Sequence, residues 1–392
     1  MHSEWKEDVH YALGFTKLWC QALGIWPWDR NIKFSILRRT FAFATQVASS
    51  VLLMERLSVY GHCGLRISLI DALGITSAFL ISATKILILS LQKDRLRDIL
   101  QSLINDWVNI RGASDLQIMK ERALWGRSAF IVQIGVAVVA VIDLSVTRYP
   151  SFGGPVGNDT TRTIIMGPSC WIPDDMSFGA YLVIYYLMFI SLWVCCGVYT
   201  GCGALMFSVA LHICGQFEIL NTSLDDLTDD DNHYQQRRKI KEYSRRHNEL
   251  LLVGNQLNHM LYLIIFTEIL GSCFLVCISG VAIMMQVKNG NVDKDIINYA
   301  LRMGVAYTGL LLYSYVGEQL FIQAEKSRLT IYQCPWYNFS PGMIKDFKFI
   351  MMRNDSFCYL TSGGISIINY EQIKDLTRIM FSYFSVFKVM LE

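Results

Sequence analysis

The sequence predicts an all-α integral membrane protein with seven transmembrane helices, a cytosolic N-terminus and an extracellular C-terminus. Of the 392 residues, 53% are hydrophobic and only 17% are charged, whereas soluble proteins carry roughly 25% charged residues. The apolar residues gather in runs of about 20, the length that a helix needs to cross a bilayer. Most Lys and Arg residues lie on alternate flanks of these runs, which indicates the direction of each crossing.

The first element, residues 1–39, is predicted to be a cytosolic segment. It mixes charged and aromatic residues and lacks the apolar stretch and small-residue cleavage site of a secretory signal. The spans that follow are predicted at Thr40–Tyr60, Ile67–Leu91, Ser128–Val146, Phe178–Leu211, Leu257–Met285, Ile296–Phe321 and, more weakly, Ile365–Leu391.

The fourth apolar run is longer than one crossing requires. Between Met176 and Phe217 there is no Asp, Glu, Lys or Arg, and at about 1.5 Å per residue such a helix is longer than the bilayer is thick. Two arrangements fit: one long helix that projects past the bilayer, or two crossings broken near Gly197, Gly201 and Gly203.

Charge bias favours the single long helix. Lys and Arg are frequent in residues 6–39, 93–127 and 237–246, the flanks assigned to the cytosol. The alternate flanks hold only Arg56 and Arg66, Arg148 and Arg162, and Lys288 and Lys294. The positive-inside rule therefore predicts one crossing in the fourth run and an inside N-terminus. G-protein-coupled receptors have the opposite orientation, and their Asp-Arg-Tyr and Asn-Pro-x-x-Tyr motifs are missing here.

Two polar segments flank the membrane runs. The loop Thr147–Ser177 is rich in Pro and Gly and is predicted to be irregular and outside. It contains the sequon Asn158-Asp159-Thr160, so Asn158 is a predicted glycosylation site. On the other side, the acidic Asp225–Asp231 followed by the basic Arg237–Arg246 is predicted to form a solvated helical extension.

The last run is too polar for a helix surrounded by lipid, because Lys388 interrupts it and charged residues precede it. At 3.6 residues per turn one stripe of this helix changes from acidic to apolar, whereas Phe381, Phe384 and Phe387 fall away from it. The stripe is formed by Glu371, Asp375, Ile379, Ser382, Val386 and Met390. Two interpretations fit this pattern: a cation-attracting vestibule that leads to an apolar constriction, or a packed tertiary helix whose charges lie below the membrane.

Several short motifs, most of them in the last 80 residues, resemble the signature of insect odorant receptors. They are Tyr315-Val316-Gly317-Glu318, Ala324-Glu325-Lys326-Ser327, Ile331-Tyr332-Gln333-Cys334-Pro335-Trp336-Tyr337 and the ending Ser382-Tyr383-Phe384-Ser385-Val386. Leu23-Gly24-Ile25-Trp26-Pro27 also resembles a Gly-x-Trp-Pro element of the family. Insect gustatory receptors are the alternative, but their Thr-Tyr…Gln-Phe ending is missing. The chain looks like a ligand-tuning subunit, because the common co-receptor is longer.

The resemblance implies a subunit of a tetrameric, odorant-gated, non-selective cation channel that assembles with the olfactory co-receptor. It implies that residues 323–364 form a cytosolic anchor helix and loop, and that residues 365–392 line a pore that passes monovalent and divalent cations. Alignment on the Tyr-Phe ending places the gate at Val386 and Met390. The expected location is the plasma membrane of a sensory-neuron dendrite.

The odorant pocket implied by the resemblance lies in the outer halves of spans two, three, four and six, within residues 40–322. Such pockets are mostly apolar with a few polar anchors, which suits a small volatile odorant. The candidate residues are Thr76, Phe79, Leu80, Val139, Asp143, Tyr181, Tyr185, Met188, Phe189, Met303, Tyr307 and Leu311.

Nothing in the sequence favours an enzyme. It has no His-Glu-x-x-His, no phosphate loop and no paired cysteine ligands, so neither a cofactor nor a metal ion is expected. The formal charge of +2 gives no reason to expect a nucleic-acid partner. The partners we expect are the co-receptor, the odorant, the permeating cations and the lipid bilayer.

Overall fold

A computed structural model describes residues 7–29, 31–60, 66–110, 112–149, 164–167, 171–172, 176–225, 233–288, 294–334, 336–353 and 359–391. These residues are mainly helical. The helices are α1 (Glu7–Ala22), α2 (Ile32–Tyr60), α3 (Arg66–Leu91), α4 (Lys93–Asn109), α5 (Ala113–Thr147), α6 (Phe178–Asp225), α7 (His233–Lys288), α8 (Lys294–Gln333), α9 (Pro341–Arg353) and α10 (Tyr370–Leu391). A 3₁₀ turn at Trp336–Asn338 and a small hairpin, β1 (Thr361–Ser362) and β2 (Ser366–Ile367), complete them.

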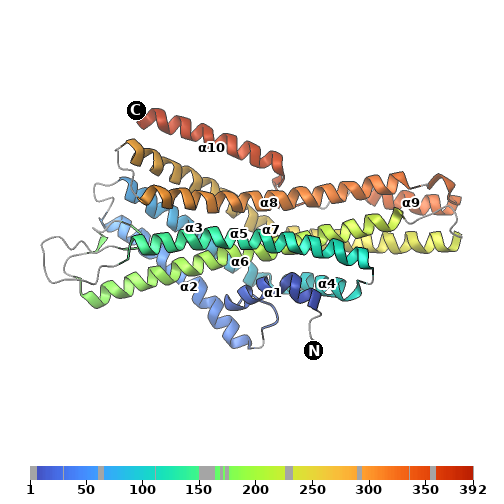
Figure 1. Cartoon of the computed structure of the whole chain (residues 1–392), viewed down its shortest axis with the longest axis horizontal. Helices are drawn as coiled ribbons and strands as arrows, with labels where there is room; N and C mark the ends of the chain where they lie inside the picture. The colour runs from blue at the N-terminus through green and yellow to red at the C-terminus, as the bar shows by residue number, and fades with distance from the viewer. Residues whose placement is uncertain are drawn as a thin grey trace.

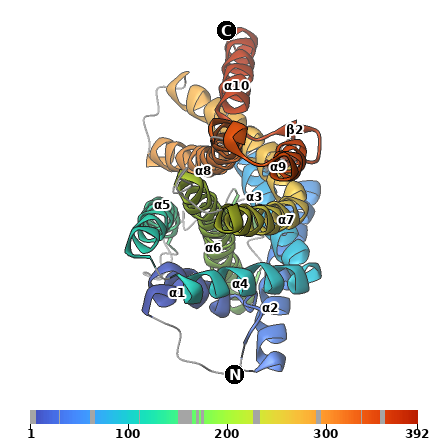
Figure 2. The same ribbon diagram turned by 90° about the vertical axis from the view of Figure 1, so that its right-hand side faces the viewer.

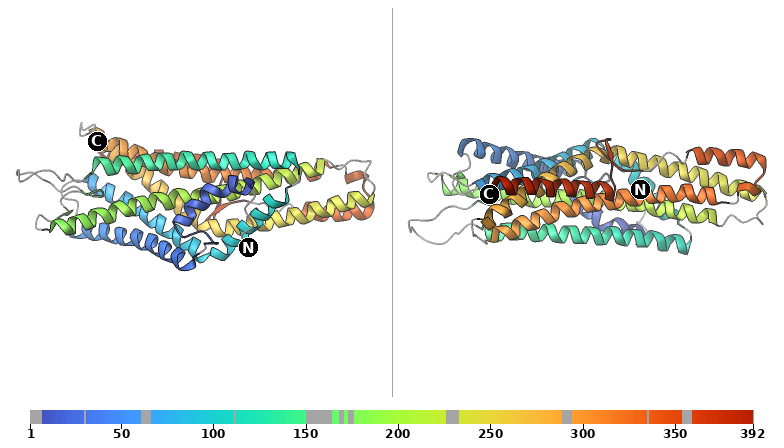
Figure 3. Two further views of the ribbon diagram at one scale, coloured as in Figure 1. Left: turned by 60° about the horizontal axis from the view of Figure 1, so that its bottom comes forward. Right: turned by 90° about the horizontal axis from the view of Figure 1, so that it is seen from above.

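The helices form one elongated bundle in which α5, α6, α7 and α8 run along the long axis (Figure 1). Helix α6 lies at its centre (Figure 2) and contacts α1, α2, α3, α4, α5, α7 and α8. Helix α10 packs on α7 and α8 and leans away from the bundle, so that it stands out in both views. We call the end where α10 terminates the outer end and the end that holds α9 the inner end (Figure 3).

Six of the seven predicted spans fall within one helix each, α2, α3, α5, α6, α7 and α8, and the seventh overlaps α10. Four segments of the described chain are long and apolar enough to cross a membrane by length and composition: Leu69–Leu91, Ala113–Thr147, Phe178–Leu224 and Tyr234–Lys288. The count of seven and the orientation of the termini stay predictions. The start of the last span was predicted wrongly, because Ile365–Ile367 belongs to the hairpin and the helix begins at Tyr370.

The fourth run forms one unbroken helix of 48 residues, about 72 Å long at 1.5 Å per residue. Two of the three glycines that suggested a break, Gly197 and Gly201, are packing sites for α1, whereas Gly203 lies beside side chains of α5 and α8. The indole of Trp19 donates a hydrogen bond of 2.7 Å to the carbonyl of Gly197, and a side chain at Gly201 would overlap the same ring. Small residues here let the Trp19 indole reach the backbone of α6.

A sharp turn after α1 explains the Gly-x-Trp-Pro element. Gly24 has a φ of 70°, which glycine adopts without steric cost, and its missing side chain leaves room for the carbonyl of Ser35. The hydroxyl of Ser35 donates to the Gly24 carbonyl at 3.0 Å. The turn sends Trp26, 1% exposed, into the core.

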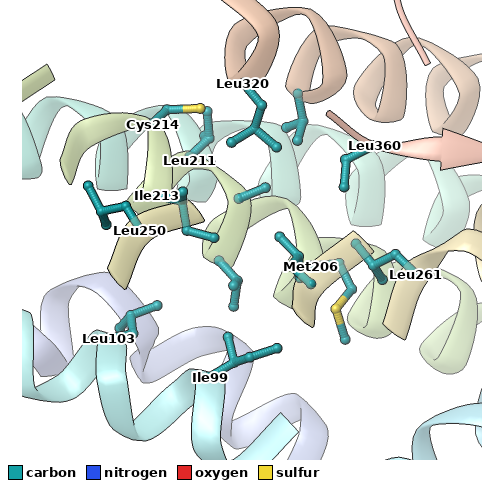
Figure 4. Packing of buried hydrophobic residues seen from close by; sticks show 14 of the residues in the cluster. Ile99, Leu103, Met206, Leu211, Ile213, Cys214, Leu250, Leu261, Leu320 and Leu360 are labelled. Atoms are coloured by element: carbon teal, nitrogen blue, oxygen red, sulfur yellow. The ribbon is translucent and has the colours of Figure 1, made fainter. Parts of the chain in front are cut away.

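The inner half of the bundle has a continuous apolar core from α1, α4, α6, α7, α8 and the hairpin region (Figure 4). Helix α4, which was not predicted, contributes Ile99 and Leu103 from one face. Arg246 of the predicted solvated extension makes two tertiary contacts here. It pairs with Asp106 of α4 at 2.5 Å and donates a hydrogen bond of 2.8 Å to Gln216 of α6. The extension therefore packs on α4 and α6 at this position.

Candidate ligand and pore sites

A cavity of about 120 Å³ lies between α3, α5, α6, α7 and α8 in the outer half of the bundle. Small residues create the space, since Gly74, Ala78, Ala137, Ala140 and Ala306 all line it. The remaining wall consists of Ile75, Phe79, Val141, Leu144, Leu192, Cys195, Cys196, Tyr199, Leu275, Arg302 and Val305. The wall is almost wholly apolar, and an engineered apolar cavity of about 150 Å³ binds benzene. This cavity therefore suits one ring or a short chain.

Charged residues bound the cavity on its outer side. Asp71 of α3 is 2% exposed and pairs with Arg302 of α8 and with Arg148 at the end of α5. Arg148 also donates to the carbonyl of Ile165, at 3.3 Å, in the loop before α6. Residues 164–166 are buried, so this loop segment packs into the outer end of the bundle.

A second ion pair lies on the inner side of the cavity. The ammonium of Lys85 on α3 is 2.7 Å from a carboxylate oxygen of Glu268 on α7, and both side chains are 1% exposed. The same ammonium lies 4.2 Å from the centre of the Tyr199 ring, which lines the cavity. Tyr199 thus separates the apolar cavity from the buried pair.

Of the twelve predicted odorant contacts, Phe79 alone is in the cavity wall. Tyr181, Tyr185 and Met188 are buried in an apolar cluster that includes Phe79 and other wall residues, and Phe189 packs against this cluster. Thr76 is buried on the same helix as Phe79.

The other predicted contacts lie away from the wall. Met303 and Tyr307 pack in a cluster with α10, and the Asp143 carboxylate accepts a hydrogen bond of 3.0 Å from Asn298. Three more are exposed, Leu80 at 53%, Val139 at 54% and Leu311 at 39%. These residues lie on α3, α5 and α8, which also line the cavity, but they are not brought together there.

Helix α10 presents two different faces. Ile373 and Met380 are buried against the bundle, and Phe384 packs with Val276 and Ala306 of α7 and α8. The predicted stripe lies on the opposite face, where Glu371, Asp375, Ile379 and Ser382 are all exposed. The side chains of Val386 and Met390 lie outside the described part of the chain, as does Asn158.

Helix α8 connects the cavity to α10. Arg302, Val305 and Ala306 face the cavity, and Ala306 also belongs to the cluster with Met380. One residue further on, the hydroxyl of Tyr307 is 3.2 Å from the hydroxyl of Thr377 on α10. A displacement of the cavity wall on α8 would therefore act directly on α10.

The prediction missed Asp71, Lys85, Glu268 and Arg302, which bound the cavity. All four are charged residues within predicted spans, and intramembrane charges are costly and tend to mark functional sites. Within the described residues there is no group of three His, Cys, Asp or Glu side chains that could hold a metal ion.

The long apolar helices and the apolar cavity fit a helical membrane protein with a site for a small apolar ligand. The family model described as 7tm Odorant receptor matches residues 67–380. This chain belongs to that family of odorant receptors, which are transmembrane ligand-gated channels of olfaction.

Solved structures show the same fold. The insect olfactory receptor OR5 from Machilis hrabei has a TM-score of 0.81 and 12% identity, with 97% of this chain and 99% of that chain covered. The same receptor in complex with eugenol has a TM-score of 0.78 and 12% identity, with 98% and 100% covered. No curated protein matches this chain by sequence.

Proposed function

We propose that the chain is the ligand-tuning subunit of an odorant-gated, non-selective cation channel. It assembles as a tetramer with olfactory co-receptor subunits in the plasma membrane of a sensory-neuron dendrite. The observation that carries this proposal is a continuous set of packing contacts. They lead from the apolar cavity through α8 to α10, whose exposed face carries the polar residues of the predicted stripe. The eugenol complex of the related fold supports a small volatile ligand.

The exposed stripe of α10 is the proposed pore surface. Glu371 and Asp375 are exposed, and carboxylates exposed on a pore wall attract cations. Val386 and Met390, further along the same helix, form the proposed apolar gate. In a tetramer, α10 of each subunit would turn this stripe toward a shared axis, while residues 323–364 anchor the subunits at the inner end.

Opening begins in the cavity in this proposal. A ligand of one ring fills the space beside Ala306 and displaces α8 relative to α7. Because Ala306 and Leu275 lie in both the cavity wall and the cluster that holds α10, this displacement moves Met380 and the stripe behind it. Tyr185 and Tyr307 remain proposed ligand contacts, Tyr307 with the additional task of holding Thr377.

Current recording from cells that express the chain with and without co-receptor tests the proposal. The test variant is Ala140→Phe, which fills the cavity from α5, and the matched control is Val132→Phe on the same helix, where the side chain is 60% exposed. We expect odorant-evoked cation current with the co-receptor, lost in Ala140→Phe and kept in Val132→Phe. Absence of current from the wild type across a broad odorant panel, at normal surface expression, would refute the channel function.

A further inference from the structure

The cavity wall contains one charged residue, Arg302, in an otherwise nearly apolar surface. A guanidinium carries five N–H donors. In the described chain one of its nitrogens, Nη1, donates to Asp71, and its charge lies 5.5 Å from the centre of the Tyr299 ring. Asp71 is the one carboxylate among the described residues that pairs with Arg302.

Asp71 does not serve Arg302 alone. Its second oxygen is 3.2 Å from Arg148, which is held in turn by the carbonyl of Ile165 and is not part of the cavity wall. One buried carboxylate is therefore shared by two guanidiniums. Arg302 keeps donors that Asp71 does not occupy, and its side chain is 15% exposed.

We propose that Arg302 makes this receptor selective for ligands that carry a hydrogen-bond-accepting oxygen: an aldehyde, a ketone, an ester or a carboxylate. The inference rests on the proposed function, since it assigns the chemical class of ligand to the same cavity. Arg302 lines the cavity, and only Nη1 of its guanidinium donates to Asp71. A ligand oxygen in the cavity can accept a hydrogen bond from one of the remaining N–H groups, whereas a hydrocarbon of the same shape cannot. The volume of about 120 Å³ restricts the rest of the ligand to one ring or a short chain.

Two isosteric pairs separate oxygen recognition from shape. Benzaldehyde and styrene differ by the exchange of a carbonyl oxygen for a methylene, as do 2-heptanone and 2-methyl-1-heptene. Dose–response curves of co-receptor-dependent current give the potency ratio within each pair. We expect the oxygenated member to be at least about tenfold more potent in the wild type, the range for a hydrogen bond to a charged donor. Benzoate tests whether a full negative charge binds as well as a neutral carbonyl.

Arg302→Met keeps the bulk of the side chain and removes its donors, and we expect it to bring the ratio close to one while the hydrocarbon response remains. Arg302→Lys keeps the charge and should give an intermediate ratio. The matched control is Arg56→Met, which removes a part-buried arginine that donates to the carbonyl of Trp171 and lies outside the cavity wall. It should leave the ratio unchanged even if surface expression falls.

Equal potency within the pairs in the wild type would overturn the inference, and so would a missing response to both oxygenated members. A ratio that survives in Arg302→Met would show that Arg302 only holds Asp71. Ligand-induced thermal stabilisation of the purified wild-type complex provides a second readout. If the oxygenated members stabilise the protein about tenfold more potently but no current flows, the channel function fails while the ligand class stands.

Discussion

The buried pair of Lys85 and Glu268 makes a sharp prediction about stability. At 2.7 Å and an effective dielectric constant of about 20, Coulomb's law gives an attraction of about 6 kcal/mol. The desolvation of both groups offsets most of this gain, so the pair contributes little net stability compared with apolar residues. Removal of one partner is different, because the other charge stays buried without compensation. We expect Lys85→Met or Glu268→Gln alone to destabilise the protein by about 3–5 kcal/mol.

The double variant Lys85→Met/Glu268→Gln removes both charges and should recover most of that loss. Thermal melting of the detergent-solubilised protein, followed by size-exclusion chromatography, measures all three variants, and surface expression gives a second measure. The control is Arg378→Met, which disrupts the exposed pair with Asp375 on α10 at 3.5 Å, where an ion pair contributes less than about 1 kcal/mol. If the double variant melts as low as the worse single variant, the two charges do not compensate each other.

Three further predictions test the helix contacts, the orientation and the gate. Gly201→Val should lower the melting temperature of the purified protein, because its side chain would overlap Trp19; an unchanged melt would contradict the close contact of α1 with α6. Tags at the two termini should stain only at the C-terminal end in unpermeabilised cells, and surface staining of the N-terminal tag alone would reverse the orientation. Val386→Ser should raise current without odorant, because a polar ring holds water in an apolar constriction. Labelling of introduced cysteines tests the same face: thiol reagents should reach position 386 and spare Phe384, and the reverse result would reject α10's stripe as the pore surface.

The sequence predicted the positions of the helices better than it predicted which face of each helix lines the cavity. Long apolar runs are visible directly, and charge bias correctly indicated that α6 is a single helix. Within their predicted spans, however, α3, α5 and α6 are apolar on most sides, and such a segment carries little periodic signal for its orientation. Val139 and Ala140 are neighbours of similar character in the sequence, yet Val139 is 54% exposed and Ala140 lines the cavity. The predicted pocket residues therefore lie on helices that line the cavity, but only Phe79 lies in its wall; their contact with an odorant stays a prediction.

Helix α10 is the contrasting case because it mixes charged and apolar residues. The periodicity that grouped Glu371 with Asp375 and Ile379 also separated Phe384 from them, and the structure places these two groups on different faces. A mixed helix reveals its orientation from spacing alone. The hairpin before it had no such signal: it depends on Gly363 and Gly364, which both have positive φ, and on Thr361 binding Asn258 of α7.

The positions of the intramembrane charges suggest how the cavity is kept open. Asp71 and Lys85 lie on the same helix, α3, and each pairs across the bundle: Asp71 with Arg302 of α8, Lys85 with Glu268 of α7. The two ion pairs therefore fix α3 to its neighbours on the outer and the inner side of the cavity. Between them the wall is almost wholly apolar and includes the small residues Gly74, Ala78 and Ala306. In the proposed opening a ligand displaces Ala306 while both ion pairs hold, and the displacement reaches α10 because Ala306 packs in the same cluster as Met380.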